Sequence, residues 1–223
     1  MPDLQNIKDQ IKQLAALGYD IDETQVRKLI HLVSELFREL LISVGYDTRQ
    51  ILRITTKFRD AGRRSAPWKP ASSKVPGRPQ DGADGNRINR WLMDKSHKFY
   101  ADEVTASLVE VKYYLQALSM EDAPDLADPE LKKAFSWMLE HTIEPGNYED
   151  PIQLVPINLA DIVKDASTIQ SGHLIPLDRS GKHEPKNAFL MLPRSNQLQG
   201  NMTLDELLAL MQTIVERHRR RKS

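Results

Sequence analysis

The stretch GHLIPLDRSGKHEPKNAFLMLPRSN, residues 172–196, differs in composition from the helical pattern of the rest of the chain. It holds two histidines, His173 and His183, and two well-spaced asparagines, Asn187 and Asn196. A glycine-containing turn lies between the histidines. Polar residues of these types in a short segment indicate a site rather than a packing surface.

The order of secondary structure around this stretch follows from its composition. The loop-forming run DRSGKHEPKN stands before the apolar run AFLML, which predicts a short buried strand. The preceding run STIQSGHLIPL combines branched residues with turn formers and lacks the 3.6-residue period. After the second strand, Thr203 and Glu206 form a capping box for the last helix. The sequence therefore predicts a strand, a loop, a strand and a helix in succession.

The last helix is expected to have one apolar face, made of Leu204, Leu207, Leu208, Met211, Ile214 and Val215. The first half of the chain is helical by the same period. Apolar residues recur at helical spacing between Asp22, which can cap a helix, and Gly45, which can end one. We expect this stripe over 22–45 to be core or a subunit interface, and it is a candidate dimer face. Helix is expected to resume at about Arg87. The predicted fold is mainly α with a small α+β part.

Composition limits the class of protein. The chain has 223 residues, of which 40% are hydrophobic and 28% charged, as in a globular protein. No apolar run approaches the ~18 residues of a membrane span, and the start lacks the pattern of a secretion signal. The absence of cysteine excludes disulfides and cysteine-ligated zinc. We therefore expect a cytoplasmic protein with no membrane partner.

The net charge of zero conceals an uneven distribution. Residues 53–98 hold twelve Lys and Arg against four Asp and Glu, whereas 102–150 hold three against twelve. From residue 171 onward there are nine against five, and the chain ends in a basic run. Two basic blocks can present a basic face to a polyanion such as DNA, or can be solvated surface.

These patterns divide the chain into four regions. Residues 1–61 are an N-terminal helical region for the core or for dimerisation. Residues 62–86 are rich in Pro, Gly and basic residues, and are a linker or a DNA-binding segment. Residues 87–150 are a second helical region, and residues 151–223 contain the strands and the last helix.

The stretch resembles the HNH, or ββα-metal, endonuclease family. In that family a histidine ends the first strand and is followed by Pro and a Gly-containing loop, as His173, Pro176 and Gly181 are here. An asparagine precedes the second strand, and a His or Asn begins the helix, as Asn187 and Asn196 do here. The resemblance covers roughly 165–215 and implies a C-terminal ββα-metal unit that hydrolyses DNA.

The resemblance also implies roles for these residues. His173 would be the base that activates water, because a neutral imidazole can accept a proton near neutral pH. Asn187 would brace the loop and hold the ring of His173. Asn196 would be an oxygen ligand for Mg²⁺ or Mn²⁺, and the bound ion would assist phosphodiester hydrolysis. All three are catalytic candidates.

The identity of a second metal ligand is not assigned. Many family members have Asp or another ligand directly before the catalytic histidine, whereas this chain has Gly172 before His173. His183 or Asp178 could supply it. Candidate contacts to DNA are basic residues of the same stretch: Arg179, Lys182, Lys186 and Arg194.

The expected function is a metal-dependent endonuclease acting on double-stranded DNA, and a homodimer is expected because one motif makes one cut. A sequence-specific restriction-type enzyme is the first hypothesis. A non-specific nuclease effector of a toxin or defence system, whose helices bind a partner protein, is the alternative. A module that binds DNA without cutting it is a third.

Overall fold

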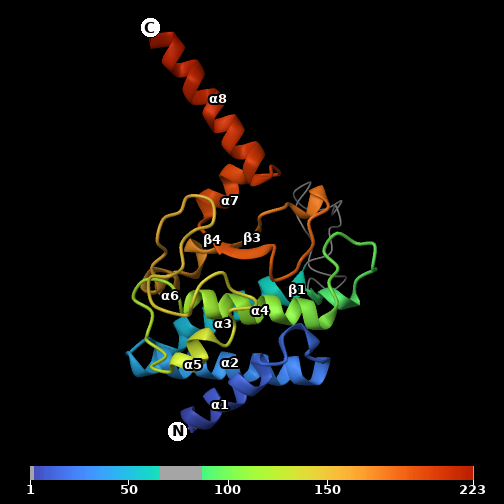
Figure 1. Cartoon of the computed structure of the whole chain (residues 1–223), viewed down its shortest axis with the longest axis vertical. Coiled ribbons are helices and arrows are strands. Elements are labelled where there is room, and N and C mark those ends of the chain that lie inside the picture. The colour runs from blue at the N-terminus through green and yellow to red at the C-terminus, as the bar shows by residue number, and fades with distance from the viewer. Residues whose placement is uncertain (1–2, 66–86, 223) are drawn as a thin grey trace.

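The structure is a computed structural model and describes residues 3–65 and 87–222. It is mostly helical with two small antiparallel sheets, in agreement with the predicted fold class (Figure 1). The helices are α1 Leu4–Ala15, α2 Glu23–Ser43, α3 Thr48–Gly62, α4 Glu103–Ala117, α5 Pro129–Lys133, α6 Leu159–Lys164, α7 Pro193–Gln199 and α8 Leu204–Lys222. The strands are β1 Arg64–Ser65, β2 Ile88–Asn89, β3 Gln170–His173 and β4 Ala188–Met191. Short 3₁₀ turns lie at Gly18–Asp20, Arg90–Leu92, Ala166–Thr168 and Leu177–Arg179.

Helix α2 begins and ends where the sequence predicts. Asp22 and Gln25 form a reciprocal capping box at its start, and Gly45 follows its end with φ +93°. Its apolar stripe is buried, because α2 packs on α1, α3 and α4. The stripe is therefore core, and the prediction that it forms a dimer face is wrong: Val26, Leu29 and Phe37 have no exposed surface to offer a partner.

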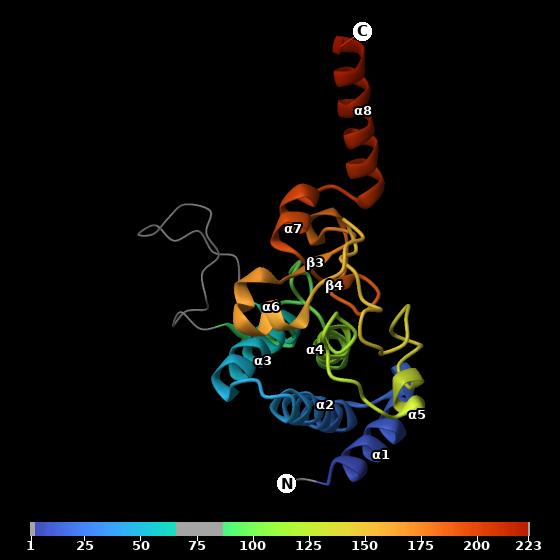
Figure 2. The same ribbon diagram turned by 90° about the vertical axis from the view of Figure 1, so that its left-hand side faces the viewer.

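Helix α4 is the centre of the molecule (Figure 2). Every residue of α4 from Ala106 to Ala117 is buried, so the helix is covered on all its sides. Its polar side chains are accommodated by partners: the ammonium of Lys112 donates to the carbonyl of Pro185, and Gln116 accepts the Leu190 amide at 3.1 Å. These contacts attach the β3–β4 hairpin to α4, so the helical core positions the candidate site.

Gly62, the last residue of α3, allows α3 to approach α4 closely. A Cβ atom at this position would lie 2.8 Å from the Cα and 2.8 Å from the amide nitrogen of Glu110. Backbone atoms cannot move aside as a side chain can, so only glycine fits. Gly62 thus fixes the end of α3, and its carbonyl oxygen becomes a hydrogen-bond acceptor inside the molecule.

The region after α3 differs from the expectation. Helix does not resume at about Arg87, because Ile88 and Asn89 form β2, which pairs antiparallel with β1, and α4 begins only at Glu103. The sheet ties residues 64–65 to residues 88–89 at the end of α3. The interpretation of 62–86 as a linker or DNA-binding segment falls largely on residues 66–86, which lie outside the described residues.

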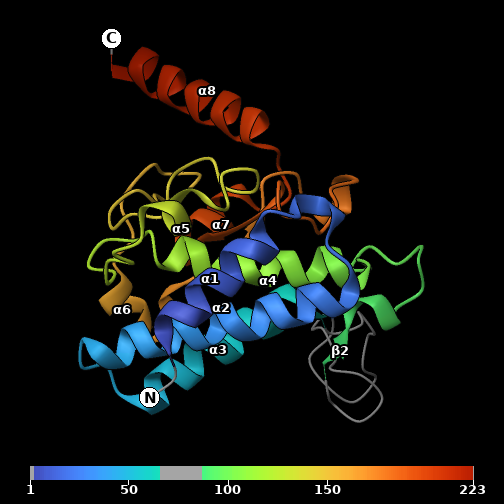
Figure 3. The same ribbon diagram turned by 60° about the horizontal axis from the view of Figure 1, so that its bottom comes forward.

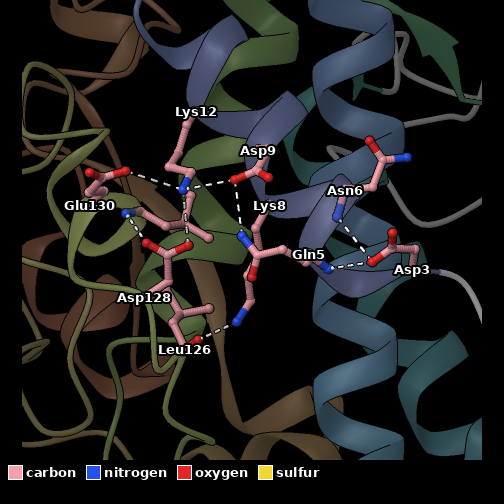
Figure 4. A network of polar contacts seen from close by, with 10 residues as sticks. Asp3, Gln5, Asn6, Lys8, Asp9, Lys12, Leu126, Asp128 and Glu130 are labelled. Carbon is pink, nitrogen blue, oxygen red and sulfur yellow. Dashed lines mark hydrogen bonds and ion pairs between the residues drawn. The ribbon is translucent and has the colours of Figure 1, made fainter.

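Helix α1 is held on the body by polar contacts with the segment before α5 (Figure 4). The ammonium of Lys8 donates to the carbonyl of Leu126 at 2.6 Å. Lys12 forms ion pairs with Asp128 at 3.2 Å and with Glu130 at 3.3 Å. These contacts join residues distant in sequence and complete a core whose buried residues run from Ile7 to Leu190.

The predicted order of strand, loop and strand is present between residues 170 and 191, and a short helix that the sequence did not predict separately, α7, stands between β4 and the predicted last helix. Strand β3 ends at His173, and β4 pairs with it antiparallel, with Gln170 opposite Met191 and His173 opposite Ala188. Helix α7 follows β4 and contacts β3. The hairpin and α7 thus bring the polar residues of the quoted stretch into one region.

Helix α8 begins at the predicted capping box, in which Thr203 and Glu206 exchange hydrogen bonds of 3.0 and 3.3 Å. It projects from the body instead of packing on it (Figures 1 and 3). Of its expected apolar face, Leu207 is buried, while Leu208, Met211 and the residues beyond are exposed. In the part of the chain that the structure describes, no helix is both long and apolar enough to cross a membrane.

Candidate active site

Two histidine rings form the centre of the candidate site. His173 ends β3, and its Nε2 lies 2.9 Å from Nδ1 of His183, which stands in the loop between the strands. The Nε2 of His183 lies 2.7 Å from the carbonyl oxygen of Gly62 at the end of α3. His183 is 2% exposed. A chain of hydrogen bonds therefore connects the strand end with the helical core.

This chain determines which ring nitrogen carries each proton. The oxygen of Gly62 can only accept, so Nε2 of His183 carries its proton, and Nδ1 of neutral His183 is an acceptor. Nε2 of His173 must then donate to it, which leaves the lone pair of neutral His173 on Nδ1. The atom of His173 that can take a proton is thus Nδ1.

Both rings are held in the neutral form. Burial lowers the pKa of His173 to about 3, and the positive charge of nearby Arg90 contributes to the shift. Burial also lowers the pKa of His183 well below its usual range, with Arg90 and His173 adding to the effect. At neutral pH, His173 is therefore a neutral hydrogen-bond donor at Nε2 with a free lone pair at Nδ1.

These shifts predict that acid destabilises the fold. The histidines of the unfolded chain have a pKa near 6.5, so between pH 6.5 and 3 the unfolded chain binds protons that folded His173 does not. The contribution of His173 is fully present above pH 6.5 and is lost as the pH falls. Its slope is at most about 1.4 kcal/mol per pH unit.

Urea denaturation at several pH values measures this slope. We expect His173→Gln to reduce the loss of unfolding free energy between pH 6.5 and 4. The control His31→Gln replaces a side chain that is 78% exposed and should leave the slope as in the wild type. An unchanged slope in His173→Gln would show that the ring is not kept neutral by the fold.

Asn187 closes the loop that carries His183. Its amide nitrogen donates to the carbonyls of Ile175 and Lys182, each at 2.9 Å, and its oxygen accepts the Ile175 amide at 2.7 Å. Asn187 is 5% exposed. All of its contacts are with backbone at the two ends of the loop, so it holds the loop's shape.

Gly181 is required in the same loop. A Cβ atom there would lie 2.0 Å from the carbonyl oxygen of Ile175, a distance that no relaxation of a side chain could relieve. The amide of Gly181 donates to the carbonyl of Pro176 at 3.1 Å. The loop is therefore folded back tightly on the end of β3.

Gln199 is a positioning residue that the sequence did not reveal. From the end of α7 its amide nitrogen donates to the carbonyls of His173 and Leu174, each at 2.9 Å, and it is 2% exposed. It holds the backbone from which the ring of His173 projects. A glutamine near a helix end carries no sequence signal of such a role, because its partners depend on where α7 lies.

Asn196 lies beside the other face of β3. Its amide nitrogen donates to the side-chain oxygen of Gln170 at 2.8 Å. Because successive side chains of a strand point to opposite faces, Gln170 and Gly172 face away from His173. The structure thus places Asn196 and the ring of His173 on opposite faces of β3, without direct contact between them.

Gly172 occupies the position at which the resemblance would lead one to expect a ligand. A Cβ atom there would lie 2.4 Å from the sulfur of Met191, so the space is filled by that side chain. Asn196 orients its amide toward Gln170, which leaves its Oδ1 as the acceptor available to a cation. One amide oxygen suits a hard cation that keeps most of its water.

The two candidates for a second metal ligand are otherwise engaged. Both ring nitrogens of His183 are hydrogen bonded, so neither is free for a metal ion in this arrangement. Asp178 lies in the 3₁₀ turn after Pro176 and pairs with Lys98 at 2.7 Å. Among residues 3–65 and 87–222, no group of three or more His, Asp or Glu side chains could hold a metal ion.

The basic residues proposed for DNA contact are distributed over the surface of this region. Arg179 pairs with Glu206 at 2.8 Å and so joins the loop to the start of α8. Lys186 pairs with Glu184 at 3.3 Å. Lys182 and Arg194 are exposed, on the loop and on α7 respectively.

A basic cleft lies at the start of β3, and Arg90, whose charge acts on His173, is one of its lining residues. It has a volume of about 650 Å³ and lies between α3, β1 and the strand end that bears Gln170 and Ser171. Asp60 is its acidic lining residue. Five cationic residues line it: Arg53, Lys57, Arg64, Arg87 and Arg90. This arrangement favours an anionic ligand.

Arg90 links the cleft to the histidine pair. It is 6% exposed, and its guanidinium donates to the carbonyls of Ala61, Gly62 and Phe99 at 3.0–3.2 Å. Gly62 thus accepts from both Arg90 and His183. The sequence indicated a basic block over 53–98, but only the fold, in which α3 packs on β1 and β1 pairs with β2, gathers these charges in one cleft.

Comparisons with known proteins identify a related fold. No protein-family model matches this sequence, and a search of curated proteins finds no match either. A solved structure described as the crystal structure of a type II restriction endonuclease is similar, with a TM-score of 0.51 and 19% sequence identity. The match covers 81% of this chain and 82% of that chain. At this identity the likeness establishes the fold, which extends over most of both chains.

Proposed function

We propose that this protein is a metal-dependent DNA endonuclease of the HNH, or ββα-metal, type. The observation that carries the proposal is the neutral ring of His173, fixed by His183 and Gly62 and near Arg90, which lines a cleft of cationic side chains. The fold shared with a type II restriction endonuclease supports it. The work of such an enzyme on DNA also favours the expected cytoplasmic location.

In this proposal the substrate lies along the basic cleft and crosses the open edge of β3. The cationic residues bind the phosphates, and His173 Nδ1 takes a proton from the attacking water. The low pKa of His173 in the free protein makes it a weak base. The negative charge of a bound phosphate offsets the positive charge of Arg90 and so raises this pKa, whereas burial, the larger cause of the shift, is relieved only as water and substrate enter the site. His183, Asn187 and Gln199 hold the ring and the loop throughout.

A divalent cation, Mg²⁺ or Mn²⁺, would be held by Asn196 Oδ1 on the other face of the β3 edge, with water and a phosphate oxygen as its remaining ligands. When bound, such an ion stabilises negative charge on the phosphate and the leaving oxygen. With so few protein ligands the ion would be weakly held and readily removed by EDTA. His183 or Asp178 could bind the ion only after a rearrangement that breaks its present hydrogen bonds or ion pair.

Sequence-specific restriction of double-stranded DNA is the favoured form of this activity. The likeness to the restriction endonuclease covers 81% of this chain, and the helical body is more than hydrolysis alone requires. A non-specific effector nuclease, with the helices engaged by a partner protein, is the alternative. A sequence-specific restriction enzyme would cut DNA into discrete fragments. A non-specific effector nuclease would give a smear of fragment sizes on a gel.

Digestion of phage DNA by the purified, metal-free chain tests the proposal. We expect cleavage with Mg²⁺ or Mn²⁺, none in EDTA, and recovery when Mg²⁺ is added back. Sequencing the fragment ends then gives the site and position of the cut. Asn196→Ala should raise the Mg²⁺ concentration required for half-maximal cleavage by about tenfold or more. Full cleavage in EDTA would contradict the ββα-metal assignment, and DNA binding with no cleavage under any metal would leave a DNA-binding module.

A further inference from the structure

Helix α8 carries an apolar face that nothing in the described part of the chain covers. Four large side chains on it are about half exposed: Leu208 is 52% exposed, Met211 47%, Ile214 44% and Val215 47%. Scattered exposed apolar residues are normal, but a contiguous face on a projecting helix indicates an interaction surface (Figure 3).

The spacing of this face is symmetric about one residue. Leu207 and Leu208 lie four and three positions before Met211, and Ile214 and Val215 lie three and four positions after it. When two such helices pair antiparallel about a two-fold axis at Met211, Leu208 of one copy lies beside Ile214 of the other. Leu207, the counterpart of Val215, is buried against its own chain, so the part of the face that is exposed and symmetric is Leu208, Met211 and Ile214. A face of this kind is complementary to itself.

The charges of α8 favour the same pairing. Asp205 and Glu206 lie in its first turn, whereas Arg217 and the basic run 219–222 lie at its other end. With the axis at Met211, antiparallel pairing places Asp205 of each copy level with Arg217 of the other and Glu206 level with Glu216, whereas parallel pairing in register places Asp205 beside Asp205 and Arg217 beside Arg217. Glu206 also pairs with Arg179 of its own chain, which fixes the start of α8 to the body.

We infer that the apolar face of α8 binds α8 of a second copy of this chain, antiparallel, with the two-fold axis at Met211. The helix is about 28 Å long at 1.5 Å per residue, sufficient for a helix–helix seam of several turns. Dimerisation then depends on α8 and not on α2, whose stripe is core. This inference stands apart from the proposed nuclease activity, because it rests on a helix that contains none of the candidate catalytic residues.

Sedimentation velocity of the full chain, without DNA or metal, tests the inference. We expect a dimer at micromolar concentration. Ile214→Glu should raise the dimer dissociation constant by about 100-fold or more, because each dimer would bury two charges in apolar surface. The control Thr213→Glu adds the same charge at the neighbouring exposed position, off the apolar face, and should leave the dimer intact. A strict monomer, or a dimer that tolerates Ile214→Glu, would overturn the inference.

Cross-linking tests the orientation, because the chain contains no cysteine. Single variants Met211→Cys and Leu208→Cys are treated with a short thiol cross-linker. In the antiparallel pair the two copies of residue 211 face each other, whereas the two copies of residue 208 are about 9 Å apart along the axis. We expect cross-linking at 211, and between Leu208→Cys and Ile214→Cys chains mixed together. Efficient 208–208 cross-linking would indicate a parallel pair and contradict the proposed geometry.

Discussion

Replacing His173 by alanine is expected to abolish strand cleavage while DNA binding remains within about threefold of the wild type. General-base catalysis contributes typically 10²–10⁴ in rate, so we expect a loss of that size in the single-turnover rate. The ring lies at the end of β3 and is not part of the hydrophobic core cluster. Quenched time courses with saturating Mg²⁺ measure the rate, and filter binding measures the affinity.

Two further variants show whether the loss is chemical. His183→Leu removes the acceptor of the His173 proton but leaves the ring of His173 in place. It should lower the cleavage rate by about tenfold and change the pH dependence of kcat/KM, because the tautomer of His173 is no longer fixed. His31→Ala, on the exposed side of α2, should have no effect. Cleavage by His173→Ala within tenfold of the wild-type rate would remove His173 from the role of base.

Neutralising the cleft is expected to weaken DNA binding and its dependence on salt. Arg53→Gln combined with Arg64→Gln removes two of the cleft's positive charges without touching Arg90 or the histidine pair. If each arginine contacts one phosphate, the slope of log K against log salt should become shallower by about 1.8, since each contact contributes about 0.9. We expect an affinity loss of about 10- to 100-fold at 0.1 M salt.

The measurement is made with a His173→Ala background, so that the DNA stays intact and binding is separated from cleavage. The matched control is Lys28→Gln combined with Arg38→Gln, which removes two exposed charges on α2 outside the cleft. If the two double variants changed the salt slope equally, the cleft would not be the DNA-binding surface. The loss of affinity would then come from the change in net charge alone.

Local patterns determined the elements that are set by neighbouring residues. The capping boxes at Asp22 and Thr203 place the starts of α2 and α8, because a helix end is decided within one turn. The hairpin of β3 and β4 was also predictable, since the loop between them has a definite composition and its strands are adjacent in sequence. His173 and Asn187 lie at the strand ends for the same reason.

The sequence could not show which of two uses an apolar stripe has. The stripes of α2 and α8 have the same helical period, yet α2 is buried on three sides while α8 projects with its face exposed. Periodicity reports that a face is apolar, but what covers it depends on the packing of distant elements. The expectation of a dimer face on α2 was wrong for this reason. The short strand β2 at residues 88–89 was missed because its pairing partner precedes it by more than twenty residues.

The site itself was decided in part by tertiary structure. The sequence by itself determined a mainly α chain, two strands near its end and the candidacy of His173, because these depend on local spacing. Only the tertiary structure decided that His183 orients His173 through Gly62, that Arg90 lies near them, and that Arg90 shares a cleft with the charges of α3. The physical reason is that Gly62 has no Cβ, which allows α3 to lie against α4 and brings a backbone carbonyl within 2.7 Å of a ring more than a hundred residues away.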